Sequence, residues 1–140
     1  MSSRITRRSI LKRITMASVF SMINGWLSPF AQAIQQVTIP LKGIPVLTEI
    51  QGGLILKIKT LKKDVLLIRT GKESVSALSP ICTHKKCTVK YKKEWGEIQC
   101  KCHGSKYSLD GKVTKGPAKK DLTAYKATIK GNNLILSIEP

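Results

Sequence analysis

Short runs of apolar residues, each bounded by glycine, proline, asparagine or charged residues, follow one another along the chain from Val37 to its end. The runs occur at residues 37–39, 54–58, 65–68, 75–78, 88–91, 97–99, 122–129 and 134–138. Short runs of this kind between turn residues are typical of β-strands. No run shows the helical period of an amphipathic helix. The pattern therefore predicts a small all-β domain.

Turn residues between the runs indicate which strands pair. Lys62-Lys63-Asp64 separates 54–58 from 65–68, and we predict a hairpin there. Gly131-Asn132-Asn133 separates 122–129 from 134–138, which we expect to pair in the same way.

Two further turn signals and three aromatic residues complete this pattern. Asp110-Gly111 is typical of a tight turn, and Trp95-Gly96 joins 88–91 to 97–99. We expect Tyr91, Trp95 and Tyr125 to pack in the core or against turns.

The N-terminal residues differ from the rest of the chain. Thr6-Arg7-Arg8-Ser9-Ile10-Leu11-Lys12 resembles the twin-arginine export pattern of a polar residue, two arginines, a spacer, two apolar residues and a lysine. A weakly apolar stretch follows at residues 14–30, and Ala31-Gln32-Ala33 offers a small-x-small cleavage site. We expect residues 1–33 to be a signal peptide or N-terminal anchor and residues 34–140 to be the folded domain.

The sequence leaves open whether this segment is removed. No charged residue occurs between Ile14 and Leu41, which is long enough to cross a hydrocarbon core of roughly 30 Å. Polar residues lower its hydrophobicity, and no glycine-rich hinge follows it. We favour twin-arginine export over an ordinary secretory signal or a basic tail. We also favour cleavage after Ala33 over an anchor through residues 14–33. We expect the domain in the periplasm, either soluble or anchored to the outer side of the inner membrane.

The chain is strongly basic, with 25 lysines and arginines, 8 acidic residues and a formal net charge of +17. Residues 34–140 keep twenty of the basic residues and all eight acidic ones, a charge of +12. Eleven lysines fall between residues 81 and 120: Lys85, Lys86, Lys90, Lys92, Lys93, Lys101, Lys106, Lys112, Lys115, Lys119 and Lys120. No aromatic platform or recognition-helix pattern accompanies them. We therefore expect an acidic protein partner or a merely solvated basic surface, and no nucleic acid.

Two pairs of one cysteine and one histidine lie within this lysine-rich stretch. Cys82 and His84 form the first pair, and Cys100 and His103 form the second. Two thiolates on one iron and two imidazoles on the other are the ligands of a Rieske [2Fe-2S] centre. The alternatives are a structural zinc site, whose usual ligand spacing differs from this one, and two ordinary disulfides. Two disulfides would leave the adjacent residues Cys102-His103-Gly104-Ser105, as a run, without a role.

At these residues the chain resembles the Rieske iron-sulfur family, and within it the high-potential branch of cytochrome bc and b6f complexes. The family pattern reads CTHxxC and CxCHGSxY. The matching residues are Cys82-Thr83-His84-Lys85-Lys86-Cys87 and Cys100-Lys101-Cys102-His103-Gly104-Ser105-Lys106-Tyr107. The resemblance implies an all-β, Rieske-type small antiparallel β-sandwich with an inserted cluster-binding subdomain at about residues 80–120.

The resemblance also implies the roles of individual residues around one [2Fe-2S] cluster. The ligands would be Cys82, His84, Cys100 and His103. Cys87 and Cys102 would form a disulfide between the two loops, which fits an oxidising compartment. Ser105 and Tyr107 occupy the positions from which family members donate hydrogen bonds to a bridging sulfide and to the first ligand cysteine. Such bonds favour the reduced cluster and raise its potential.

A third loop matches the family only in part. Gly116-Pro117-Ala118 corresponds to the start of the family's proline loop. The family usually continues with a second proline, where this chain has Lys119. It usually has an apolar residue after the first ligand histidine, where this chain has Lys85. In bc complexes that apolar tip docks beside the quinol pocket, so Lys85 argues against direct quinol oxidation.

These observations predict electron transfer by a high-potential Rieske [2Fe-2S] cluster in an exported protein. Its partner would be an acidic redox protein such as a c-type cytochrome. The alternative is the iron-sulfur subunit of a quinol:cytochrome c oxidoreductase, a cytochrome bc complex. Lys85, the cleavage site and the missing hinge favour the carrier, whereas the second cysteine pair and the proline-loop start keep the subunit open. Ring-hydroxylating oxygenases use the same ligands, but their members lack the second cysteine pair and are cytoplasmic.

Overall fold

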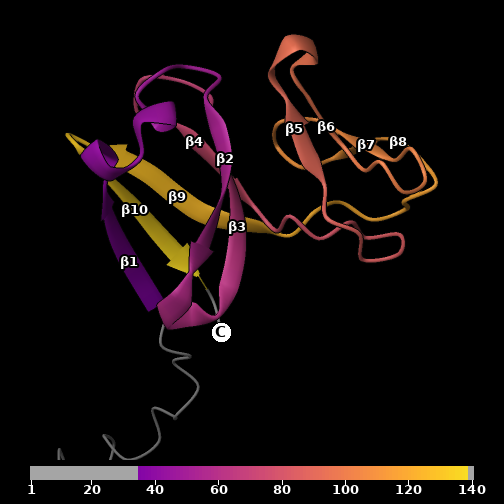
Figure 1. Cartoon of the computed structure of the whole chain (residues 1–140), viewed down its shortest axis with the longest axis horizontal. Helices are drawn as coiled ribbons and strands as arrows, with labels where there is room; N and C mark the ends of the chain where they lie inside the picture. Colours follow the sequence, from indigo (N-terminus) through magenta and orange to yellow (C-terminus); the bar gives the residue numbers. More distant parts are fainter. Residues whose placement is uncertain (1–34, 139–140) are drawn as a thin grey trace, which may run out of the picture. The chain divides into compact units, whose positions relative to one another are not determined.

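A computed structural model describes residues 35–138 of the chain (Figure 1). These residues belong to the second of two units, residues 33–140. The twin-arginine pattern, the cleavage site and the expected anchor lie outside the described residues. The described part contains ten strands and four short 3-10 helices, and none of its helices is long and apolar enough to span a bilayer.

Six antiparallel strands form the larger sheet, in the order β1-β10-β9-β4-β3-β2. They are β1 (Gln35–Pro40), β2 (Gly53–Ile58), β3 (Lys63–Arg69), β4 (Val75–Leu78), β9 (Ala124–Lys130) and β10 (Asn133–Ile138). Three 3-10 helices connect them: η1 (Leu41–Gly43), η2 (Pro45–Leu47) and η3 (Lys59–Leu61). Both predicted hairpins are present, since β2 pairs with β3 and β9 with β10.

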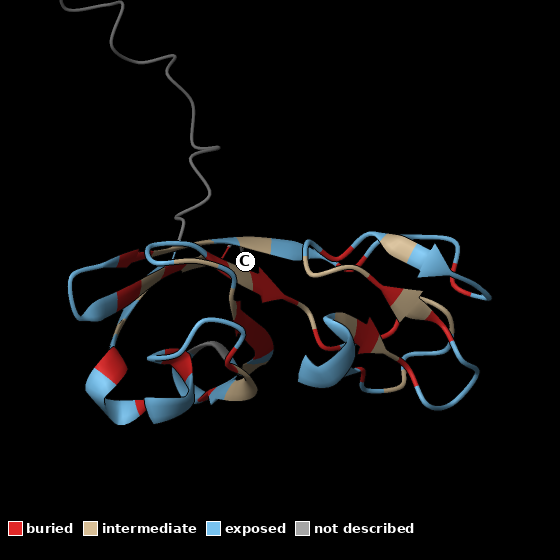
Figure 2. Cartoon of the chain, turned by 90° about the horizontal axis from the view of Figure 1, so that it is seen from above, coloured by how far each residue is buried: buried red, intermediate tan, exposed pale blue. Residues whose placement is uncertain are grey.

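One hydrophobic core lies inside this sheet. Val37 of β1 and Leu56 of β2 both pack against it, although these strands are the two edges of the sheet. Because side chains from both edges reach one core, the sheet folds over itself into two layers (Figure 1). Buried positions recur along its strands (Figure 2). The predicted small antiparallel β-sandwich is confirmed.

A second sheet is inserted between two neighbouring strands of the first. Its order is β5-β6-β7-β8. The elements are β5 (Lys90–Lys92), η4 (Lys93–Trp95), β6 (Glu97–Gln99), β7 (Lys106–Tyr107) and β8 (Val113–Lys115). The chain leaves the large sheet after β4 and returns at β9, which pairs with β4. Residues 79–123 are therefore the inserted subdomain that the resemblance implied.

Strand β3 joins the two parts because both of its faces are buried. Val65 and Leu67 point into the core of the large sheet. Leu66 and Ile68 pack in a second core together with residues of the inserted subdomain, among them Tyr107. Fully burying one such aliphatic side chain contributes about 1.5–3 kcal/mol. The inserted subdomain therefore rests on an apolar platform that the large sheet provides.

Two predicted strands begin later than the apolar pattern indicates. The run at 122–129 becomes strand only at Ala124, because Leu122 is buried in the second core and its N–H donates to Gly111 O at 2.9 Å. The run at 88–91 becomes strand only at Lys90, because Val89 N–H donates to Pro80 O at 2.8 Å and closes a loop.

Trp95 and the pair β7–β8 also differ from expectation. Trp95 is 65% exposed in the turn η4, so the first of its two expected places, the core, is wrong. The ammonium groups of Lys92 and Lys106 lie 6.0 and 5.8 Å from the centre of its ring. Tyr91 and Tyr125 are partly buried against the two cores, as expected. Strands β7 and β8 are too short to show a pattern, and only the turn between them is predicted.

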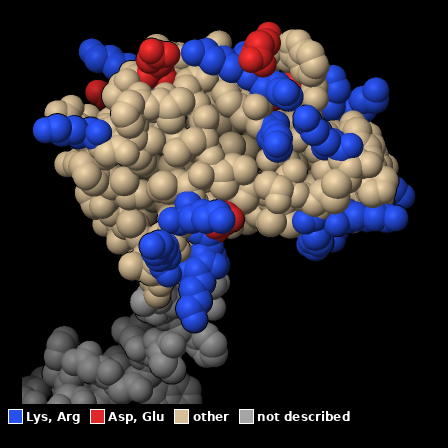
Figure 3. Space-filling model, in the orientation of Figure 1, with Lys and Arg blue, Asp and Glu red and all other residues tan. Residues whose placement is uncertain are grey.

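Basic side chains dominate the charged surface on the face drawn in Figure 3, and all but Arg69 of the basic residues that the structure describes are lysines. Three lysines of the inserted subdomain form ion pairs within the described residues: Lys93 with Glu49 at 3.6 Å, Lys106 with Glu97 at 2.8 Å, and Lys112 with Asp110 at 3.5 Å. Five exposed lysines of three loops form no ion pair with any described residue, and we call them the lysine rim. They are Lys85, Lys86, Lys101, Lys119 and Lys120.

Candidate metal centre

Two loops with the same hydrogen-bond pattern carry the four cysteines and both histidines. In the first loop, between β4 and β5, Cys82 N–H donates to Cys87 O at 2.8 Å and Lys86 N–H to Cys82 O at 3.0 Å. The second loop, between β6 and β7, repeats both bonds at the same spacing, from Cys100 N–H to Ser105 O at 2.8 Å and from Gly104 N–H to Cys100 O at 3.0 Å. Each loop thus turns back on itself around its first cysteine.

The loops are joined by one disulfide and present two free thiols. Cys87 and Cys102 are disulfide-bonded with 6.5 Å between their Cα atoms, which confirms the implied bridge. Cys82 and Cys100 are free, with exposed fractions of 0% and 2%. Both pack in the second core, and each thiol lies close enough to affect the pKa of the other. Both thiols therefore lie together in the interior, under the bridge.

Three of the cysteine sulfurs form a compact group that is not itself a metal site. The sulfurs of Cys87, Cys100 and Cys102 lie within 4.8 Å of one another. A metal is bound by thiolate sulfur, and two of these three sulfurs are held in the disulfide. The thiolate donors that remain to the loops are Cys82 and Cys100.

The two histidine rings contact each other at the surface of the two loops. Their centroids are 4.8 Å apart with an interplanar angle of 84°, and His84 is partly buried whereas His103 is exposed. The Nδ1 atom of His84 is buried and has no hydrogen-bond partner among the described residues. An unpaired buried polar atom costs about 1–3 kcal/mol. This nitrogen is therefore available to a metal ion, and a donor set of two buried thiols and two adjacent imidazoles fits a [2Fe-2S] cluster.

Tyr107 lies beneath the first loop and is fully buried. Its hydroxyl lies 3.2 Å from Cys82 Sγ and 3.1 Å from Thr83 Oγ1. Burial raises the pKa of the Cys82 thiol, but hydrogen bonds with Tyr107 and with the backbone N–H of His84 outweigh burial and leave this pKa below its ordinary value. Burial also raises the pKa of Tyr107, so its hydroxyl keeps its proton and can donate it.

The third loop, residues 116–121, is tied to both of the others. Ser105 is fully buried, and its Oγ accepts a hydrogen bond from Ala118 N–H at 3.0 Å. Thr83 Oγ1 donates to Lys120 O at 2.6 Å. The start of the proline loop that the sequence indicates therefore does form a third wall beside the two cysteine loops.

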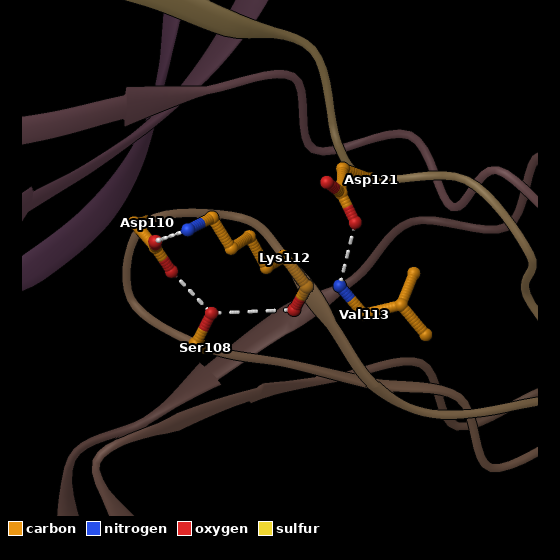
Figure 4. A network of polar contacts seen from close by, with 5 residues as sticks. All are labelled: Ser108, Asp110, Lys112, Val113 and Asp121. Carbon is orange, nitrogen blue, oxygen red and sulfur yellow. Dashed lines mark hydrogen bonds and ion pairs between the residues drawn. The ribbon is translucent and has the colours of Figure 1, made fainter.

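Polar contacts fix the end of this third loop on the β7–β8 turn (Figure 4). Asp121 Oδ1 accepts a hydrogen bond from Val113 N–H at 2.8 Å. Within the turn, Ser108 Oγ donates to the Asp110 carboxylate and lies 3.2 Å from Lys112 O. The turn, β8 and the third loop therefore form one hydrogen-bonded unit, which holds Lys120 where Thr83 reaches its carbonyl.

Reasoning from the sequence did not assign a role to Thr83 or Asp121. Thr83 stands between two proposed ligands, and a hydroxyl at that place is the only signal the sequence offers. Its partner Lys120 lies 37 residues further along the chain, so only the fold brings the two together.

Comparison with known proteins gives consistent family matches. The Rieske [2Fe-2S] domain matches residues 44–126. The cytochrome b6-f complex iron-sulfur subunit of Chlorobaculum tepidum is 30% identical over 139 residues, which cover 94% of this chain and 75% of that subunit. The subunit of the same name from Synechococcus sp. (strain JA-3-3Ab) is 36% identical over 72 residues, or 51% of this chain and 42% of that subunit.

Solved structures share the fold. The plasma membrane Rieske protein PetC3 from Synechocystis PCC 6803 matches with a TM-score of 0.57 and 33% identity, over 71% of this chain and 97% of that one. A hyperthermophilic respiratory Complex III matches with a TM-score of 0.54 and 24% identity, over 84% of this chain and 88% of that one, and shows the fold alone. The chain therefore belongs to the Rieske [2Fe-2S] family, with one [2Fe-2S] cluster as its cofactor and electron transfer as its activity.

Proposed function

We propose that this protein is an exported electron carrier, with Cys82 and Cys100 on one iron of the cluster and His84 and His103 on the other. The observation that supports this assignment is the sorting of donors: thiol beside thiol in the interior, and imidazole beside imidazole at the surface. When bound, such a cluster supplies one-electron transfer at a potential between roughly −150 and +300 mV.

The surrounding residues favour the upper part of that range. Tyr107 Oη lies 3.2 Å from Cys82 Sγ, and a hydrogen bond donated to this sulfur stabilises added negative charge. Ser105 Oγ accepts from Ala118 N–H, and its own proton meets no acceptor among the residues that the structure describes. The Ser105 hydroxyl is thus available to donate to a bridging sulfide. Both bonds strengthen on reduction and raise the potential.

Electrons would leave or enter through the exposed side of His103 toward a redox protein. The exposed lysines of the lysine rim lie on the same three loops as the proposed site, so the partner that fits is acidic, and a periplasmic c-type cytochrome is the example we propose. Lys85 is exposed at the place where the family usually has an apolar residue. A charged tip there suits an aqueous protein partner better than an apolar quinol pocket.

Spectroscopy and voltammetry of the purified protein test this function. We expect a coloured protein that gives a rhombic EPR spectrum after dithionite treatment, and a midpoint potential above roughly 0 mV. Cys82→Ser and His103→Gln should lose the spectrum, whereas Lys85→Gln, beside a ligand, should keep it. A colourless protein that contains zinc would contradict the assignment of a [2Fe-2S] cluster. A midpoint potential below roughly 0 mV would contradict the proposal that the cluster is a high-potential one.

A second function, the iron-sulfur subunit of a quinol-oxidising complex, is favoured by the relatives. The subunit from Chlorobaculum tepidum bears the name of the cytochrome b6-f complex, and this chain covers 75% of it. Extraction of native membranes in mild detergent separates the two functions. Co-purification of haem b in a fixed ratio with this chain would support the subunit, and recovery without haem b supports the carrier.

A further inference from the structure

Three polar groups surround the Tyr107 hydroxyl, and the protons that they and the hydroxyl carry can be counted. The Tyr107 oxygen lies 3.2 Å from Cys82 Sγ, 3.1 Å from Thr83 Oγ1 and 3.4 Å from the Thr83 backbone nitrogen. The backbone N–H can only donate, so it points its proton at the tyrosine oxygen. The single proton of the tyrosine hydroxyl remains for either Cys82 or Thr83.

The direction of the Thr83 hydroxyl is decided by the third loop. Its oxygen lies 2.6 Å from Lys120 O, and a carbonyl oxygen can only accept. The single proton of Thr83 Oγ1 is therefore committed to Lys120. Toward Tyr107, the Thr83 oxygen can act only as an acceptor.

We propose that Thr83 competes with Cys82 for the Tyr107 proton and thereby holds the cluster potential below the value that an uncontested Tyr107–Cys82 bond would give. This inference rests on the proposed function, in which Cys82 is a ligand. Added negative charge on the cluster draws the proton toward the Cys82 sulfur. Thr83 stabilises the oxidised form relative to the reduced form because it offers the proton a second acceptor. Thr83 is thus a positioning residue that acts through Tyr107.

Other contacts hold Tyr107 in place without Thr83. Tyr107 is fully buried in the second core, and its backbone pairs with Ile98 of β6 and Val113 of β8. Removing the Thr83 hydroxyl therefore leaves the ring where it is and takes one acceptor away from the Tyr107 hydroxyl, besides the bond that Thr83 donates to Lys120. A residue that merely held the ring would have the opposite effect, since its loss would weaken the Tyr107–Cys82 bond.

The sign of the change in midpoint potential tests the proposal. In the cluster-containing full chain, Thr83→Val should raise the midpoint potential and Tyr107→Phe should lower it. The double variant should match Tyr107→Phe, because Thr83 has no route to the sulfur without the tyrosine proton. Thr83→Ser, which keeps the hydroxyl, should keep the native potential. Thr88→Val, in the same loop and exposed, is the matched control and should also keep it.

A second measurement follows the third loop directly. Trypsin cleaves after lysine, and the carbonyl of the Lys120–Asp121 bond is the one that Thr83 holds. Cleavage at this bond should become faster in Thr83→Val and stay at the native rate in Thr83→Ser. Faster cleavage with a lower potential would assign Thr83 to loop attachment and overturn the competition.

Other outcomes separate this proposal from the proposed function. An unchanged or lowered potential in Thr83→Val, with the EPR spectrum intact, overturns the competition and leaves the ligand assignment standing. If Thr83→Val loses the cluster, Thr83→Ala carries the same expectation. Loss of the cluster in both would show that the hydroxyl holds the loops together, and would also overturn the competition. A native protein without a Rieske spectrum would instead remove the proposed function itself.

Discussion

At the scale of single residues, the two cysteine loops need the same unusual backbone conformation and meet that need differently. Gly104 has a φ of 75° and Lys86 a φ of 60°. Both residues donate their N–H to the carbonyl of the first cysteine in their loop. Glycine adopts this left-handed conformation freely, whereas a side chain costs about 1–2 kcal/mol. The first loop therefore carries strain that the second avoids.

Substitutions at these two positions test whether the first loop is strained. Gly104→Ala should lower the free energy of unfolding by about 1 kcal/mol through backbone strain alone, because no atom lies within 4 Å of the added Cβ. Lys86→Gly, the reciprocal change, should raise it by less than about 1 kcal/mol, since glycine also adds entropy to the unfolded chain. Denaturant unfolding measures both, and a more stable Gly104→Ala would contradict the expectation.

Glu97 gives a pH dependence with a defined sign. A hydrogen bond from the Lys106 ammonium at 2.8 Å, and another from Gln99, lower the pKa of Glu97 below its ordinary value. A carboxyl with a lowered pKa stabilises the fold above its unfolded pKa of about 4.3, and this contribution is lost as the pH falls through its lower folded pKa.

Glu97→Gln should therefore lower the melting temperature at neutral pH. The difference from the native protein should shrink as the pH falls below about 4. Glu73→Gln removes an exposed carboxylate next to β4 and is the control. A difference that stays constant down to strongly acidic pH would show that the loss is not electrostatic.

At the scale of elements, the apolar pattern predicts strands well where one face of the strand is buried. It predicts them poorly where tertiary contacts determine whether an apolar residue lies in a strand or is buried. The β9–β10 hairpin follows from its pattern and turn. Leu122 has the same apolar character, yet it packs in the second core before the strand begins. Trp95 is apolar and nevertheless exposed. For Leu122 the deciding partners, among them Leu66 and Ile68 of β3, lie far away in the sequence.

The candidate site divides in the same way. The disulfide could be predicted, and the ligand residues could be proposed, because the spacing within each loop is local and chemically distinctive. The wall formed by the third loop is only partly predictable, since Ala118 reaches Ser105 and Lys120 reaches Thr83 through backbone groups. A backbone N–H or carbonyl is present at nearly every residue, so no sequence pattern indicates these two bonds.

The disulfide should act on the loops as a clamp. It joins residues 15 apart in the sequence, and closing a loop of that length contributes roughly 3 kcal/mol. Replacing Cys87 and Cys102 together by alanine leaves all four proposed ligands in place. On heating, we expect this double variant to lose the cluster at a lower temperature than the native protein. The visible absorbance of the cluster measures the loss. As a control, Cys82→Ala removes a proposed ligand and should fail to retain a cluster at any temperature. If the double variant keeps its cluster to the same temperature as the native protein, the bridge is not a clamp.

At the scale of the whole molecule, the three loops of the proposed site carry positive charge that no ion pair with a described residue balances. In the described part of the chain, the ion-paired lysines lie on or beside the strands and turns of the inserted subdomain, whereas the lysine rim is confined to the three loops. Paired charges largely cancel at a distance, so the long-range field that a partner meets comes mainly from the unpaired lysines.

Charge reversal within the rim should therefore slow electron transfer to an acidic cytochrome. Lys85→Glu should lower the second-order rate constant by up to about tenfold at low ionic strength, because steering of the encounter is weakened. The difference should vanish near 1 M salt, where the screening length is about 3 Å. Lys112→Glu makes the same charge change in the β7–β8 turn and is the matched control, and a basic cytochrome should respond to Lys85→Glu in the opposite direction. If Lys85→Glu and Lys112→Glu slow electron transfer equally, the net charge of the protein, and not the lysine rim, steers the partner.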